Sequence, residues 1–203
     1  MSYTLKVFIV FPMSLLLNLH THHPLYSGEA TIHTAGLHPW HVTQEWHKVL
    51  ASLDMIGTDA VGECGLDRLC DTPYELQKEA FRAQIELSES LHKPLILHCV
   101  RAMDDVLLLK RTTRQPWVWH GFRGKPAQLH QLLHHGFYIS FAFRYNEESL
   151  RQCPVDRLFL ETDDINMPIA PLYTKVAAHL GITEECLCQH LWKNLHHLVG
   201  MKT

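Results

Sequence analysis

The sequence lacks three features that would each place it in a special class of protein. None of its six cysteines stands in a C-x-x-C pair, which excludes a zinc knuckle or a dithiol redox motif of that type. Its longest apolar segment, Val7–Leu17, is interrupted by Pro12 and is far shorter than the roughly 20 residues that span a bilayer. Its 18 Lys and Arg do not exceed its 21 Asp and Glu, so the net charge of −3 gives no general attraction to nucleic acid.

No linker, internal repeat or low-complexity segment divides the chain. A chain of 203 residues can bury one core without disulfides or a structural metal, so we expect a single domain and a metal only where chemistry requires it. Met13 offers a second candidate start, and we expect an accessory extension over 1–12 and one domain over 13–203. Scattered thiols without a pairing framework favour the reduced state, and we expect a cytoplasmic protein with no membrane contact.

Short apolar runs alternate with longer amphipathic segments, which is typical of βα units that build a parallel sheet. The expected strands are Leu15–His20, Thr31–Leu37, Met55–Gly62, Pro94–Cys99, Pro116–His120, Phe137–Phe141 and Arg157–Glu161. The expected helices are Thr43–Leu53, Tyr74–Leu91, Ala102–Thr112, Pro126–His135, Glu147–Gln152, Pro171–His179 and Thr183–Leu198. Only 13 residues, 23 to 35, separate His22 from Gly36, too few for a further βαβ unit of about 30 residues.

Histidines and carboxylates follow the expected strands, where parallel α/β folds place their active sites. The sequence has 17 histidines, and His20 and His22 are two residues apart, so a strand would present both to one cation. By the same alternation we expect Glu161 and Asp163 to share a face. Each signal also has a structural interpretation, as an exposed, capping or core residue. Together they form a ligand set suited to two divalent ions such as Zn²⁺, Mn²⁺ or Mg²⁺, made of His20, His22, Glu63, His98, His120 and Asp163.

The order of these motifs, H-x-H, GECGLD, HC, HGFRG and ETD, resembles the TatD family of metal-dependent hydrolases in the amidohydrolase superfamily. The resemblance runs from about Leu15 to the C-terminus and includes the segment Gly36–His41 as a G-x-H-P motif. It implies a TIM-type (β/α) barrel, here shortened and distorted by the loss of about one strand-helix unit after the first strand. It also implies hydrolysis, mostly of DNA phosphodiester bonds in characterised members, at a centre of two metal ions.

The resemblance also implies individual roles. His20 and His22 match the first metal pair, Glu63 the bridging carboxylate, and His98 and His120 the histidines of the second site. Asp163 matches the last carboxylate ligand, which also orients the attacking water. The chain departs from the family where Asn18 replaces an acidic residue and where the loop Ile165–Pro171 is short.

Four further residues are candidates for substrate binding. Arg101 and Arg123 follow the two histidine motifs, where each could neutralise a phosphate or remain a solvated loop charge. His38 and Trp40 could line the entrance, with Trp40 as a platform for a base or as a core residue. The sequence therefore favours a metal-dependent deoxyribonuclease or phosphodiesterase with Asp163 and Glu63 as catalytic carboxylates and DNA or another phosphodiester as substrate. Hydrolysis of a small-molecule or aminoacyl ester or amide, and metal binding with little turnover, remain the alternatives.

Overall fold

The computed structural model describes residues 33–163, 165 and 167–200, which fall into two compact units, 33–120 and 121–200. Several predictions lie outside these residues: the extension 1–12, the strand Leu15–His20, the gap after His22, and the ligands His20 and His22. The single domain over 13–203 stays a prediction. No helix within the described residues has both the length and the apolar character needed to cross a bilayer.

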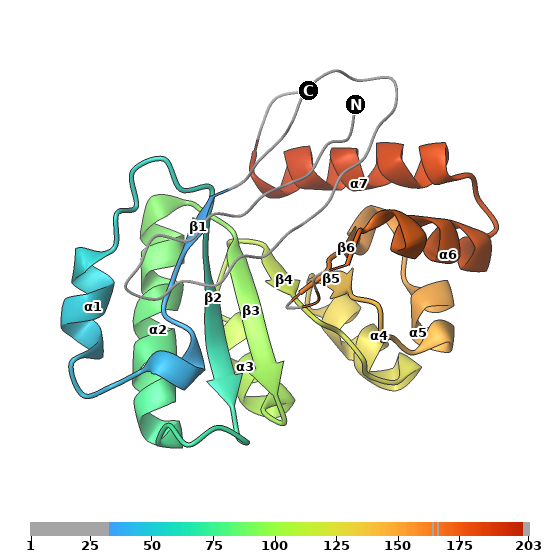
Figure 1. Cartoon of the computed structure of the whole chain (residues 1–203). Helices are drawn as coiled ribbons and strands as arrows, with labels where there is room; N and C mark the ends of the chain where they lie inside the picture. The colour runs from blue at the N-terminus through green and yellow to red at the C-terminus, as the bar shows by residue number, and fades with distance from the viewer. Residues whose placement is uncertain (1–32, 164, 166, 201–203) are drawn as a thin grey trace. The chain divides into compact units, whose positions relative to one another are not determined.

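The first unit, 33–120, is a parallel sheet of four strands with helices (Figure 1). Strand β3 is the continuous apolar run Leu95–Leu97 followed by His98, as expected for a parallel strand that is buried on both faces. Helix α2 packs against β2 and places Phe81 edge-on against Trp117 of β4 in the core. The elements are β1 Thr34–Ala35, a 3-10 turn Pro39–His41, α1 Trp46–Ser52, β2 Ala60–Asp67, α2 Tyr74–Leu91, β3 Leu95–Val100, α3 Met103–Lys110 and β4 Trp117–Trp119.

The second unit, 121–200, contains two paired parallel strands and helices whose apolar faces form its core. Helix α7 packs against β6, and Asn194 of α7 donates to the carbonyls of Val155 and Leu158 at 2.8 Å each. The side chain of Thr183 caps α7 by accepting from the backbone N–H of Cys186. The elements are α4 Pro126–His134, β5 Tyr138–Phe141, α5 Glu147–Gln152, a 3-10 turn Val155–Arg157, β6 Leu158–Leu160, α6 Ala170–Leu180 and α7 Glu184–Leu198.

The expected elements within the described residues are present, and the α/β class is confirmed, but the strand expected at Met55–Gly62 is misplaced. Its first residues form a loop in which Ile56 is exposed and Gly57 has a φ of +76°. The strand β2 instead begins at Ala60 and continues to Asp67. Helix α1 is also shorter than expected, since it begins at Trp46 and not at Thr43.

A bulge explains why β2 continues past Gly62. The pairing of β2 with β3 changes register between Val61 and Cys64, so two residues, Gly62 and Glu63, lie opposite one. Gly62 has a φ of +142°, and a Cβ there would lie 2.5 Å from the Ile96 carbonyl oxygen. Glycine therefore permits the bulge, and the bulge redirects the side chain of Glu63.

Candidate metal centre

Strand β2 presents two buried carboxylates to one face. Glu63, Gly65 and Asp67 alternate along the strand after the bulge, so their side-chain positions share a side of the sheet. Gly65 is needed between them, because a Cβ at Gly65 would collide with the carbonyl oxygen of His98 on the paired strand β3. Glu63 is 2% exposed, so its carboxylate lies inside the unit.

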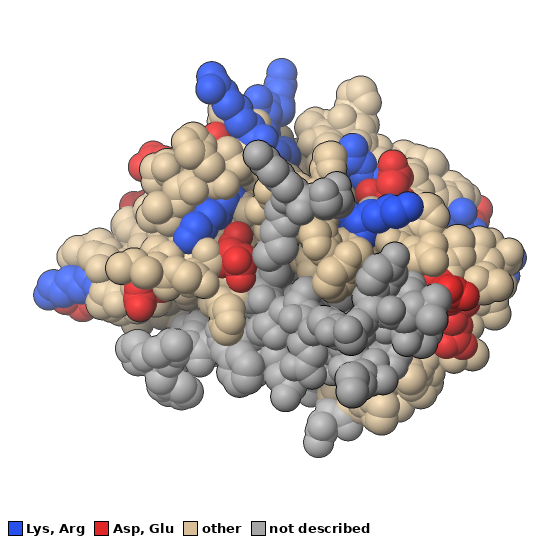
Figure 2. Space-filling model, turned by 90° about the horizontal axis from the view of Figure 1, so that it is seen from above, with Lys and Arg blue, Asp and Glu red and all other residues tan. Residues whose placement is uncertain are grey.

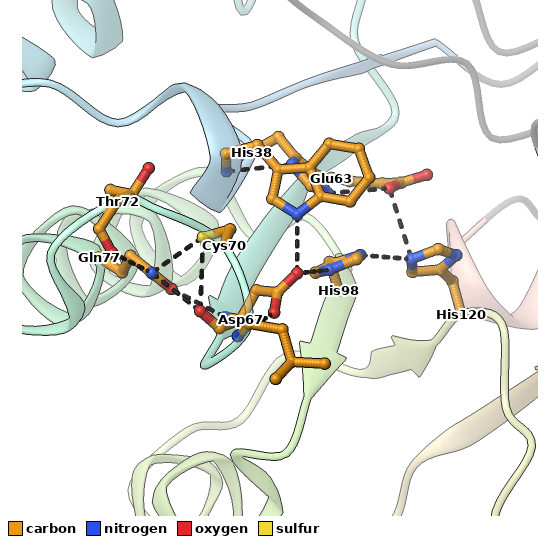
Figure 3. Close-up of polar contacts among 10 residues, drawn as sticks. His38, Glu63, Asp67, Cys70, Thr72, Gln77, His98 and His120 are labelled. Atoms are coloured by element: carbon orange, nitrogen blue, oxygen red, sulfur yellow. Dashed lines mark hydrogen bonds and ion pairs between the residues drawn. The ribbon is translucent and has the colours of Figure 1, made fainter.

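Three histidines surround Glu63. Oε2 of Glu63 lies 3.5 Å from Nε2 of His120 and 4.0 Å from Nε2 of His38. Nδ1 of His98 lies 3.0 Å from Nε2 of His120, and Figure 3 shows these two rings end to end beside Glu63. His38, Glu63 and His98 each offer one ligand atom, and these atoms all lie within 4.8 Å of one another. The structure therefore brings the predicted ligands Glu63, His98 and His120 together.

His38 has a different place from the one the sequence suggested. It was expected at the entrance, but it is 3% exposed and its ring lies 4.3 Å, centroid to centroid, from that of His98. Its Nδ1 accepts from the backbone N–H of Trp40, which leaves Nε2 directed at the cluster. This buried Nε2 has no hydrogen-bond partner among the described residues. His38 is thus a further candidate ligand.

The surroundings of His38 and His98 favour their neutral imidazole forms at pH 7. Burial, together with the neighbouring rings of His98, His120 and His41, lowers the pKa of His38 to about 2. Burial and the His120 ring lower the pKa of His98 to about 4, against the opposing effect of Asp67. A neutral imidazole is the form that binds a metal ion. The neutral imidazoles of His38 and His98, the carboxylate of Glu63 and the buried Nε2 of His38 together fit a divalent ion of the Zn²⁺ or Mn²⁺ type.

Asp67 is a functional residue that the sequence analysis missed. Its Oδ2 accepts from Nε1 of Trp40 at 2.7 Å and lies 3.3 Å from Nε2 of His98. These bonds, together with one from the backbone N–H of Leu69, outweigh burial and hold the pKa of Asp67 below its usual value. Alternation from Glu63 through Gly65 would have identified Asp67, had the strand not been expected to end at Gly62.

Two buried glutamines of α2, seven residues apart, hold the segments that carry this site. Gln84 accepts from the backbone N–H of Leu37 at 2.6 Å and donates to its carbonyl at 3.1 Å, directly before His38. Gln77 accepts from the backbone N–H of Asp67 at 2.8 Å and donates to its carbonyl at 2.9 Å. Each amide thus makes the pair of bonds that a neighbouring strand would make.

The remaining predicted residues lie outside the strands and α-helices. Trp40 is 56% exposed, and Arg101, directly after β3, is exposed with a φ of +52°. Arg123 and Asp163 belong to the second unit, where Arg123 is exposed and Asp163 is partly buried. Strand β6 ends at Leu160 and Asp163 has a φ of +53°, yet one carboxylate oxygen of Asp163 lies within 4.8 Å of one of Glu161, as expected for two residues that share a face.

Comparison with known proteins identifies the family. The family model described as TatD related DNase matches residues 18–200. The chain belongs to the TatD family. Among curated TatD proteins named 3′-5′ ssDNA/RNA exonuclease, that of Erwinia tasmaniensis is 33% identical over 72% of this chain and 61% of its own length. That of Citrobacter rodentium is 32% identical over 82% of this chain and 69% of its own length.

Solved structures of the TatD family share the fold. The TatD homolog YJJV of Escherichia coli K12 superposes with a TM-score of 0.69 at 22% identity, over 87% of this chain and 79% of that chain. A TatD family hydrolase of Entamoeba histolytica gives a TM-score of 0.70 at 17% identity, over 84% and 75%. The three first curated relatives are matched over 56%, 61% and 56% of their own lengths, so this chain spans little more than half of them.

Proposed function

We propose that this chain is a divalent-metal-dependent phosphodiesterase that degrades single-stranded DNA or RNA from the 3′ end. The observation that supports this most directly is the buried donor set of His38, Glu63 and His98, with His120 in contact. The named activity of the TatD relatives supplies the substrate class and the direction of attack.

The proposed centre holds two ions, with the ligands distributed as the family resemblance implies. By that resemblance Glu63, His98, His120, His20, His22 and Asp163 would hold the ions. When bound, such ions supply a water of lowered pKa and a positive charge opposite the phosphoryl oxygens. The chain's own contribution is to hold neutral imidazoles and carboxylates ready, with Glu63 and Asp163 able to accept the proton of the attacking water.

In this proposal a few individual side chains, and not the net charge of the protein, attract the substrate. On the face seen in Figure 2, Lys and Arg side chains are interspersed with Asp and Glu, in keeping with a net charge of −3. We assign the phosphate contacts to Arg101 and Arg123, because both are exposed and each follows a histidine motif. Trp40, exposed beside His38 and His98, is the proposed platform for a terminal base.

The test combines metal analysis with assays on separate substrate classes. Full-length protein loaded with Mn²⁺ or Mg²⁺ is incubated with 5′-labelled single-stranded DNA and RNA, with a generic phosphodiester, and with a carboxyl ester and an amide. We expect products that shorten stepwise from the 3′ end, and loss of this activity with a chelator. Ester or amide turnover without phosphodiester turnover would favour the alternative hydrolase, and stoichiometric metal without any turnover would favour a metal-binding protein.

A further inference from the structure

The carboxylate of Asp67 joins a candidate metal ligand to the exposed ring of Trp40. Its Oδ2 accepts from the indole Nε1 at 2.7 Å and lies 3.3 Å from Nε2 of His98 (Figure 3), while Oδ1 accepts from the backbone N–H of Leu69 at 2.7 Å. Because a carboxylate only accepts, this contact places the proton of a neutral His98 on Nε2. Nδ1 of His98 then keeps its lone pair on the side of Glu63 and His120.

The backbone of Asp67 is itself fixed. Gln77 of α2 pairs with both its N–H and its carbonyl, and Asp67 lies beside Val100 of β3 in the sheet. The side chain of Gln77 is buried. The Asp67 carboxylate is therefore attached to a fixed backbone. We infer that it orients the two side chains that it contacts, Trp40 and His98.

Trp40 differs from the other groups around Asp67 because it is more than half exposed. Its indole N–H is satisfied by Asp67, and its ring stands nearly perpendicular to the rings of His38 and His98, with interplanar angles of 83° and 77°. An exposed aromatic ring held in one orientation can stack on a base with little loss of side-chain entropy.

We propose that Asp67 is a positioning residue that couples metal binding at His98 to base stacking on Trp40. This inference rests on the proposed function. A metal on Nδ1 of His98 makes the N–H at Nε2 a stronger donor to Asp67, which restricts the carboxylate and, through it, the indole. A base then meets a ring that is already ordered, so the two binding events favour each other.

The coupling is measured by Mn²⁺ titration calorimetry of the full chain, with and without saturating deoxyadenosine, which carries a base and no phosphate. For the wild type we expect deoxyadenosine to tighten Mn²⁺ binding severalfold. In Asp67→Asn, which keeps the size but removes the charge, we expect Mn²⁺ affinity to fall about 10–100-fold and the effect of deoxyadenosine to vanish. The matched control is Asp59→Asn, since Asp59 lies just before β2 and its carboxylate accepts from the backbone N–H of His33.

The outcomes separate this inference from the proposed function. Suppose that the wild type binds Mn²⁺ and cleaves phosphodiesters, and that Asp67→Asn behaves like Asp59→Asn. This result would overturn the proposed role of Asp67 but would leave the proposed function unaffected. A wild type without Mn²⁺ binding or turnover would overturn the proposed function. Nitrogen-15 NMR of the metal-free wild type tests the positioning without a variant of Asp67. We expect His98, assigned by the loss of its signals in His98→Gln, to be protonated at Nε2, and protonation at Nδ1 would contradict the inference.

Discussion

Glu63 and Glu161 are both buried glutamates in the motifs that follow apolar strand residues, yet their surroundings differ. Glu161, at 0% exposure in the second unit, accepts from the backbone N–H of Gly121 at 2.6 Å and from the hydroxyl of Ser140. Two of the polar atoms near Glu63 are imidazole nitrogens of His120 and His38, which lie 3.5 and 4.0 Å from its Oε2, longer than a good hydrogen bond.

The two carboxylates differ in the hydrogen-bond donors that neighbouring groups offer them. A buried charge is stable when fixed N–H and O–H groups donate to it, and Glu161 has two such donors, one on the loop after β4 and one on β5. Glu63 instead lies beside the imidazole nitrogens of His120 and His38, which, like its own oxygens, are ligand atoms for a cation. We therefore expect changes at Glu63 to affect chemistry first, and changes at Glu161 to affect stability first.

The largest effect is expected for Glu63→Gln. The amide keeps the size but loses the charge that binds metal and accepts a proton, so phosphodiester turnover should fall at least about 10²–10⁴-fold. The melting temperature of the chelator-treated protein should stay close to that of the wild type, because a buried charge is removed along with its interactions. Glu79→Gln, on the exposed face of α2, is the control. Full turnover in Glu63→Gln would show that the Glu63 carboxylate is not needed for catalysis.

The next effect is expected for Asp163→Asn. If Asp163 orients the attacking water, turnover should again fall about 10²–10⁴-fold at saturating Mn²⁺, and the neighbouring change Asp164→Asn should cost far less. Both variants are first shown to fold by circular dichroism. Equal losses would mean that the catalytic carboxylate at this loop is misassigned.

A moderate effect on stability is expected for Glu161→Gln. The new amide NH₂ would face either the N–H of Gly121 or the hydroxyl of Ser140, and two donors cannot bond to each other. The free energy of unfolding should therefore fall by about 1–3 kcal/mol. Ser140→Ala removes only one donor and should cost less. Urea unfolding of metal-free protein measures both. An unchanged midpoint in Glu161→Gln would show that this carboxylate is not a structural one.

The smallest effect concerns Lys110, a buried cation whose Nζ donates to Thr113 and to the carbonyl of Gln115. Burial lowers the pKa of Lys110 to about 8, against the opposing charge of Glu89. The unfolded chain then binds more protons than the folded one between about pH 8 and the ordinary lysine value, so stability should rise with pH in that range. We expect Lys110→Met to reduce this rise by about 1 kcal/mol in unfolding experiments at pH 8 and 9.5. A rise of equal size in both proteins would contradict the lowered pKa.

The sequence predicted the strands around His98 and His120 well, because continuous apolar runs such as Leu95–Leu97 mark buried parallel strands. The bounds predicted for β2 were wrong. The bulge at Gly62 and Glu63 depends on close packing against Ile96, and the order of apolar and polar residues in the sequence does not show such packing. Asp67 was missed for the same reason.

The roles of Gln77 and Gln84 depend on the fold in another way. Each binds a backbone far from it in the sequence, Asp67 and Leu37, and a polar side chain on an amphipathic helix gives no sign of such a partner. His38 was identified from its motif, but its burial beside Glu63 follows from the 3-10 turn that Pro39 begins. The residue types of the site could be read from the sequence, whereas their distances could not.

Anomalous diffraction from crystals of the full chain grown with Mn²⁺ would show whether the side chains around Glu63 hold a catalytic divalent ion. We predict an anomalous peak within ligand distance of a Glu63 oxygen and of Nδ1 of His98, absent in crystals of Glu63→Gln. A peak elsewhere, or none at Mn²⁺ concentrations that support phosphodiester turnover, would contradict a catalytic metal ion at Glu63.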